Sequence, residues 1–193
     1  MHLGIKKTIV NGNGQKIRWD YIQKLYQKEN CEGLRAATKL TNRHLHYDNE
    51  KMNVRLAAQV LSNSVCDALL YLNGSDPNFE GSLATAEFCL FFNNAFDILN
   101  SRKQLSNKPF NNSINENTFQ KYSDFLKDFS FYVQGLSFED GTKVVHSQRK
   151  TGFVGMILAI KNALEYYKIL REEGNMTYLL TYKLSQDHLE TFF

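Results

Sequence analysis

Proline, cysteine and long apolar stretches are all scarce in this chain of 193 residues. Its two prolines, Pro77 and Pro109, leave room for long uninterrupted helices and argue against a sandwich of short strands. The three cysteines form no Cys-x-x-Cys pair, which argues against a disulfide scaffold or a zinc site and favours a reducing compartment. No stretch reaches the ~18 apolar residues that span a membrane, and residues 1–4 do not open a signal peptide. We therefore expect a mainly helical, intracellular protein with no membrane partner.

The abundant residues are hydrophobic and aromatic, which is typical of a protein with a folded core. Hydrophobic residues make up 42% of the chain and aromatic residues 13%, which excludes disorder throughout. The net charge of +3 permits an anionic partner. It is far below the basic excess expected where phosphate contacts alone drive nucleic-acid binding.

Apolar periodicity predicts a short N-terminal hairpin followed by helices. The hairpin is expected over residues 8–19, because the Asn11-Gly12 pair tolerates the positive φ of a tight turn. Helices are predicted directly after the hairpin and over residues 32–46, 50–72, 88–99, 119–135 and 151–172. Residues 101–117 are rich in asparagine and are expected to form a mobile surface loop. Residues 138–144 are expected to form a turn or hairpin, and Ser185 to cap a further helix.

Two segments resemble nucleotide-binding motifs without completing them. In residues 149–155 (RKTGFVG) the lysine precedes the glycines, the reverse of a Walker A loop, so a helix start is the simpler interpretation. In residues 107–110 (NKPF) a phenylalanine replaces the aspartate that would accept the guanine N–H groups in an Asn-Lys-x-Asp motif. Neither segment is taken as a phosphate or guanine site.

Two pairs of polar residues have a spacing that could serve a ligand. Asp97 and Asn100 lie three residues apart on a phenylalanine-rich helix and therefore share one edge of it. A carboxylate there could accept hydrogen bonds from guanine N1–H and N2–H2, but from the spacing alone a polar border beside a core face is the better explanation. Asp187 and Glu190 are also three apart, at a helix start where acidic groups are favoured by the helix dipole.

Four segments, in this order, carry a family resemblance: residues 51–62 (KMNVRLAAQVLS), 96–102 (FDILNSR), 149–155 (RKTGFVG) and 178–190 (YLLTYKLSQDHLE). Together they resemble the P-element transposase family, which includes THAP-domain relatives. The resemblance implies an RNase H-like catalytic fold, with two aspartates and one glutamate that bind divalent metal, interrupted by a helical insertion domain that binds GTP. This chain resembles the insertion domain, a mainly α, bundle-like fold with an N-terminal hairpin and incomplete RNase H-like remnants at both ends.

The resemblance also implies domain boundaries and site residues. Residues 1–30 would be a lead-in, 31–176 the GTP-binding insertion domain and 177–193 the start of the C-terminal RNase H-like segment. Glu190 would be the catalytic, Mg²⁺-binding glutamate. The positions matched to GTP binding are Val54, Ser62, Asp97, Asn100 and Asp187. At the position before Val54, where the family tends to have lysine, this chain has Asn53, which removes a positive charge near the nucleotide.

In the family, GTP positions the complex with transposon-end DNA in the nucleus and is not hydrolysed. This chain has no segment that supplies the two catalytic aspartates and no C-x-C…C-x-x-H zinc module. Since one carboxylate cannot hold two metals, we expect no DNA cleavage by the chain alone. The alternative is a degenerate or domesticated helical scaffold that binds protein or DNA without nucleotide. The apolar residues of 178–193 also suggest self-association.

Overall fold

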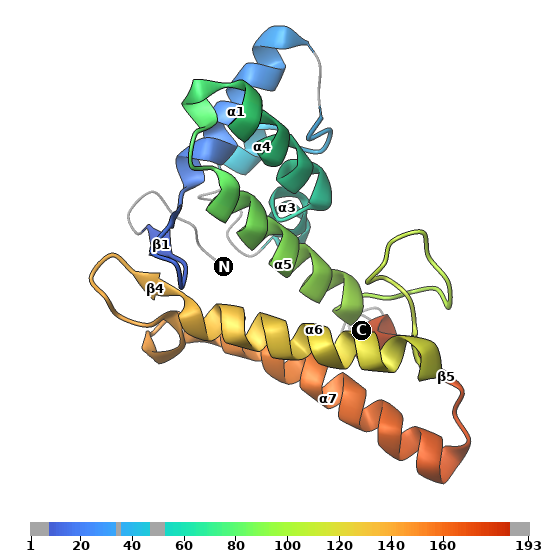
Figure 1. Cartoon of the computed structure of the whole chain (residues 1–193). Coiled ribbons are helices and arrows are strands. Elements are labelled where there is room, and N and C mark those ends of the chain that lie inside the picture. Colours follow the sequence, from blue (N-terminus) through green and yellow to red (C-terminus); the bar gives the residue numbers. More distant parts are fainter. Residues whose placement is uncertain (1–7, 34–35, 47–52, 186–193) are drawn as a thin grey trace. The chain divides into compact units, whose positions relative to one another are not determined.

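The computed structural model describes residues 8–33, 36–46 and 53–185, and within these ranges helices predominate (Figure 1). The helices are α1 (Trp19–Glu32), α2 (Asn42–Leu45), α3 (Val54–Val60), α4 (Asn63–Ser75), α5 (Leu83–Leu99), α6 (Glu116–Gly135) and α7 (Lys150–Gly174). Short 3-10 turns are η2 (Pro77–Phe79), η3 (Val144–His146) and η4 (Thr181–Leu184). The strands are β1 (Ile9–Val10), β2 (Lys16–Ile17), β3 (Ile114–Asn115), β4 (Ser137–Phe138) and β5 (Tyr178–Leu179). The predicted mainly helical class is confirmed, and none of the described helices is long and apolar enough to cross a membrane.

The predicted N-terminal hairpin is confirmed, and its turn is organised by one asparagine. The Asn11 side-chain oxygen accepts hydrogen bonds from the backbone N–H groups of Asn13 (3.1 Å) and Gln15 (2.9 Å). The left-handed conformation that closes the turn is taken by Gly14, with φ 79°, and not by the Asn11-Gly12 pair from which the hairpin was predicted. Strand β1 pairs antiparallel with β2 and also with β4, so the hairpin belongs to a three-stranded sheet of order β2-β1-β4.

The chain forms two compact units. The described residues up to Asn93, together with Tyr132–Lys150, make up the first unit. Residues Asn94–Phe131 and those from Thr151 onward make up the second. This division concerns compactness, and the expected three-part division at residues 30 and 176, with its RNase H-like remnants, stays a prediction.

The first unit is built on helices α1 and α4, which pack against each other (Figure 1). Its core includes Ile22 and Leu25 from α1 and Leu69 from α4, all almost completely buried. The phenylalanine-rich helix α5, expected from its spacing, is confirmed, and Phe88 and Phe92 are fully buried on it.

The second unit places helices α6 and α7 side by side (Figure 1). The rings of Phe119 on α6 and Tyr167 on α7 lie 6.0 Å apart, and Arg171 forms an ion pair with Glu116 at 2.9 Å. Strands β3 and β5 form a two-stranded antiparallel sheet. Both helices confirm the sequence prediction: α6 ends at Gly135 as expected, and α7 runs to Gly174, two residues beyond the expected range.

The helix expected over residues 32–46 is a wrong prediction. Helix α1 ends at Glu32 because Gly33 adopts a left-handed conformation (φ 72°) and donates its N–H to the carbonyl of Glu29. Within the described part of this segment, only Glu32, the last residue of α1, and the four residues of α2 are helical. Gly33 is the second residue of the expected helix, and its left-handed conformation does not fit a right-handed helix at that point.

The single helix expected over residues 50–72 is also wrong, because two helices occupy the described part of it. Asn53 caps α3, its side-chain oxygen accepting from the Leu56 N–H at 3.2 Å. Helix α3 ends at Val60, and Ser62 takes an extended conformation (φ −112°, ψ 158°) before α4 begins. Residues 47–52, where the helix was expected to start, lie outside the described residues.

Candidate nucleotide-binding site

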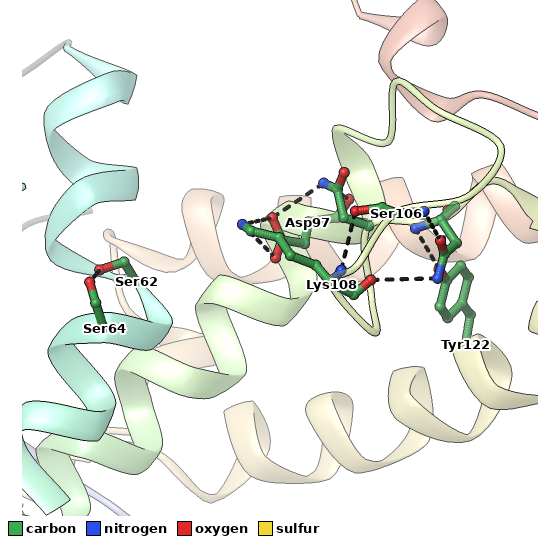
Figure 2. Close-up of polar contacts among 8 residues, drawn as sticks. Ser62, Ser64, Asp97, Ser106, Lys108 and Tyr122 are labelled. Carbon is green, nitrogen blue, oxygen red and sulfur yellow. Dashed lines mark hydrogen bonds and ion pairs between the residues drawn. The ribbon is translucent and has the colours of Figure 1, made fainter. Parts of the chain in front are cut away.

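Asp97, in the last turn of α5, is the buried acidic residue at the centre of the candidate site. Only 6% of the residue is exposed, and its carboxylate accepts hydrogen bonds from the Lys108 ammonium at 3.0 Å (Oδ1) and 3.2 Å (Oδ2). The Asn111 amide donates to Oδ1 at 3.3 Å and to the Asp97 backbone carbonyl at 3.2 Å (Figure 2). Folding has therefore surrounded this carboxylate with N–H donors.

The Lys108–Asp97 ion pair joins one buried and one exposed partner. The side chain of Asp97 is 9% exposed, whereas that of Lys108 is 60% exposed. A buried carboxylate needs donors to offset its lost hydration, while an exposed ammonium keeps much of its water. The lysine consequently marks the side from which solvent, or a ligand, reaches the carboxylate.

The asparagine-rich segment between α5 and β3 has a defined conformation set by its own side chains. The Ser106 N–H donates to the Asn112 side-chain oxygen at 2.6 Å. The Asn112 N–H donates to the Tyr122 hydroxyl at 3.2 Å, and that hydroxyl donates to the Asn112 carbonyl at 3.1 Å (Figure 2). Burial raises the pKa of Tyr122 to about 12, so its phenol stays a neutral donor near pH 7. Part of the expected loop over 101–117 is instead strand β3 and the start of α6.

Asn100 follows the last residue of α5 and stays close to Asp97. Its backbone N–H donates to the Asp97 carbonyl at 3.3 Å, and the residue is half-buried. The next residue, Ser101, is fully buried and hydrogen-bonded to Thr181. The two residues predicted to share an edge of the helix therefore lie within one turn of each other.

The other predicted site residues lie either in the first unit or outside the described residues. Val54 is the first residue of α3 and is 63% exposed, and the Ser62 hydroxyl lies 3.1 Å from that of Ser64 (Figure 2). Both belong to the first unit, whereas Asp97 and Asn100 belong to the second. Asp187 and Glu190 lie outside the described residues. These four assignments stay predictions.

Sequence reasoning missed Lys108 and Asn111 as partners of Asp97. The segment 107–110 was set aside because it lacks the aspartate of a guanine-reading motif. In the structure a carboxylate does stand beside its lysine, but it comes from α5, eleven residues earlier. The available signal in the sequence was Lys108, a lysine among uncharged residues that follows the helix carrying Asp97.

The described residues give little support to a metal site, a thiolate nucleophile or a phosphate-binding loop. Within ranges 8–33, 36–46 and 53–185, no three His, Cys, Asp or Glu residues gather as a metal site. Burial raises the pKa of Cys66 to about 11 and also raises that of Cys89, which disfavours a thiolate nucleophile. Gly152 and Gly155 lie inside α7, which begins at Lys150, so they do not form a phosphate-binding loop.

Comparison with known families decides the membership of the chain. Residues 2–113, more than half of the 193 residues, match the family described as TNP-like, GTP-binding insertion domain. The chain belongs to this family. The resemblance to P-element transposases is thereby confirmed.

Two relatives of this insertion domain are transposases. The DNA transposase THAP9 of Homo sapiens is 30% identical over 177 residues, which cover 90% of this chain and 19% of that protein. The transposable element P transposase of Drosophila melanogaster is 27% identical over 188 residues, covering 94% of this chain and 23% of that protein. The chain thus spans about a fifth of the length of these relatives.

A solved structure shares the fold of this insertion domain. It is the Drosophila P element transposase strand transfer complex, matched with a TM-score of 0.78 and 25% sequence identity. The match covers 97% of this chain and 41% of the compared chain. The agreement extends over both compact units and is not limited to the segment matched by the family model.

Proposed function

We propose that this insertion domain binds GTP, with Asp97 reading the guanine edge, and that the nucleotide positions a complex and is not hydrolysed. The observation that carries the proposal is the buried Asp97 carboxylate, whose two oxygens are met by N–H donors. Guanine presents two such donors side by side, N1–H and N2–H2, at a spacing that suits a carboxylate. The chemistry of the residues present therefore fits the base.

The remaining family positions are proposed to complete the site. Asn100 would contact the nucleotide beside Asp97, and Val54, Ser62 and Asp187 would line other parts of it. Asn53 supplies a helix cap where relatives tend to place lysine, so the charge that would face the phosphates is absent at this position. Binding is consequently expected to depend mainly on the base.

A positioning role is supported by the absence of a phosphate-wrapping loop where the sequence comes nearest to one. The glycines of residues 149–155 are helical, so their backbone N–H groups are not arranged around a γ-phosphate. Hydrolysis requires such an arrangement to organise the phosphate and the attacking water. GTP would therefore act as a stable ligand.

The larger assembly is part of the proposal. We propose that a full-length protein containing this domain acts on transposon-end DNA, as the names of its transposase relatives suggest, and that it does so in the nucleus, as the family resemblance implies. Glu190 would be its Mg²⁺-binding glutamate, beside two aspartates that this sequence does not supply. The chain alone is then inactive in strand transfer, which an assay with Mg²⁺, GTP and labelled DNA ends would test.

Calorimetry with GTP and ATP tests the nucleotide proposal. The wild-type chain is expected to prefer GTP, and Asp97→Asn, which keeps the side-chain volume, to weaken GTP binding by about tenfold or more, as for the loss of a hydrogen bond to a charged group. Asp124→Asn is the matched control, because Asp124 is an exposed acid of the same unit that pairs with Lys127. Equal binding of GTP and ATP, or none, would remove the proposal.

The second candidate is a helical scaffold that has lost nucleotide binding. One observation favours it, since Lys108 already neutralises Asp97, and the family resemblance adds that Asn53 stands where a lysine is expected. It predicts a folded chain that ignores GTP but retains a protein or DNA partner. Pull-down with and without GTP separates the two functions.

A further inference from the structure

Lys108 is held where it could contact a base together with Asp97. Its ammonium lies 3.0 and 3.2 Å from the two carboxylate oxygens, and it has three donors, of which these contacts use at most two. Since 60% of its side chain is exposed, incoming molecules can reach this lysine. A carboxylate and an ammonium at one point present acceptors and donors together.

The backbone around Lys108 is anchored independently of its side chain. The Lys108 N–H donates to the Ser106 hydroxyl at 3.2 Å, and the Lys121 ammonium donates to the Pro109 carbonyl at 2.8 Å. These contacts hold the segment on both sides of Lys108. Its four-carbon side chain can therefore move by rotation alone, without unfolding the loop.

We propose that Lys108 is a second guanine-reading residue, donating to guanine O6 while Asp97 accepts from N1–H and N2–H2. The inference rests on the proposed GTP site. The ammonium moves from between the two carboxylate oxygens onto one of them and reaches the neighbouring O6. The pair then matches the acceptor–donor–donor order of the guanine edge.

The same arrangement rejects adenine for two reasons. Adenine carries an amino group at position 6, which would place N–H donors against the ammonium, and its N1 is an acceptor facing the carboxylate. Buried polar groups left without partners make such rejection strong. Asp97 and Lys108 together thus read three atoms of the base, whereas Asp97 alone reads two.

The test is the affinity of Lys108→Met for GTP, ITP and ATP, measured by calorimetry. Methionine keeps the apolar stem and removes the donors. GTP and ITP both carry O6, so both are expected to bind about tenfold more weakly, while their ratio, which reports the 2-amino group, stays unchanged. ATP binding should not fall, so the preference for GTP over ATP shrinks. Lys108→Arg should restore part of the GTP affinity.

Lys121→Met is the comparison, because Lys121 anchors the same loop through the Pro109 carbonyl and should lower the affinity for GTP less than Lys108→Met does. GTP binding by Lys108→Met as tight as wild type, or tighter, would overturn the inference and make the lysine a tether or a competitor. An equal loss in Lys121→Met would also overturn it, by pointing to loop structure. If the wild-type chain binds no GTP, the proposed function itself fails, and that outcome is distinct from the others.

Discussion

Burial decides what single polar residues do in this chain. Asp97 and Asp124 are both aspartates on long helices, yet Asp97 is enclosed with Lys108 and Asn111 whereas Asp124 is exposed beside Lys127. The exposed pair contributes little, because water screens it. The enclosed carboxylate must keep its donors or exchange them for those of a ligand. This difference is the reason that Asp97 is the better ligand candidate.

Ser101 and Thr181 form a buried polar contact across 80 residues of sequence. The Ser101 N–H donates to the Thr181 hydroxyl oxygen at 3.1 Å, and that hydroxyl donates to the Ile98 carbonyl. Both residues are almost completely buried, so a lost partner is not replaced by water. The contact ties the end of α5 to η4 inside the second unit.

Replacing the hydroxyl of Thr181 should therefore destabilise the chain. Thr181→Val keeps the shape but leaves the Ser101 N–H without its acceptor, and we expect a loss of about 1–3 kcal/mol in the free energy of unfolding. Urea denaturation followed by circular dichroism measures it. Thr181→Ser, which keeps the hydroxyl, should lose less; a larger loss in the serine variant would assign the effect to the methyl group.

At the scale of elements, caps determine where helices begin and end. The long helices α5, α6 and α7 were each predicted from their apolar periodicity, and the structure contains all three. The errors occur where a capping residue interrupts a continuing pattern, at Gly33 and at Ser62. Periodicity reports which face is apolar, whereas termination depends on backbone conformation at one residue.

Asn53 offers a test of the cap at the start of α3. Its side chain accepts from the Leu56 N–H, so Asn53→Lys should lower the free energy of unfolding by about 1 kcal/mol. Asn53→Asp keeps a capping oxygen and should be close to wild type. Thermal unfolding of the variants distinguishes them, and a lysine variant as stable as wild type would show that the cap contributes nothing. A real loss would mean that asparagine stabilises α3 at the position where the family resemblance implies a lysine.

At the scale of the whole molecule, the single tryptophan reports on one unit. Trp19 packs against the core of the first unit, beside residues of α1 and α4. The second unit has its own core around Tyr122, Phe129 and Tyr167. Fluorescence of Trp19 therefore follows the first unit, whereas circular dichroism follows the helices of both.

Leu69→Ala should strongly destabilise the first unit. Leu69 is completely buried on α4, and truncating a buried leucine costs about 2–5 kcal/mol through lost apolar contact and the cavity left behind. The shift of the Trp19 fluorescence transition in urea measures this cost. Leu70→Ala is the matched control, because the neighbouring Leu70 is 45% exposed and its truncation should change stability little. Similar shifts in both variants would contradict the assigned core.

Family membership is likewise a property at the scale of the whole molecule. The insertion domain spans about a fifth of its transposase relatives, so catalysis, Mg²⁺ binding and the DNA partner concern a larger protein and remain proposals here. The segments at residues 51–62 and 96–102 that carry the resemblance lie within the matched range 2–113. Those sequence segments identified the family, whereas composition and periodicity alone predicted only a helical protein.

The sequence by itself determined the helical class, the N-terminal hairpin and the three longest helices, because these depend on neighbouring residues. It also determined the family, because the resemblance is carried by short sequence segments. Only the tertiary structure decided that Asp97 is buried and that Lys108 and Asn111 surround it. It likewise brought Ser101 to Thr181. Such contacts join separate elements, and no local pattern records them, because burial is the result of how the whole chain packs.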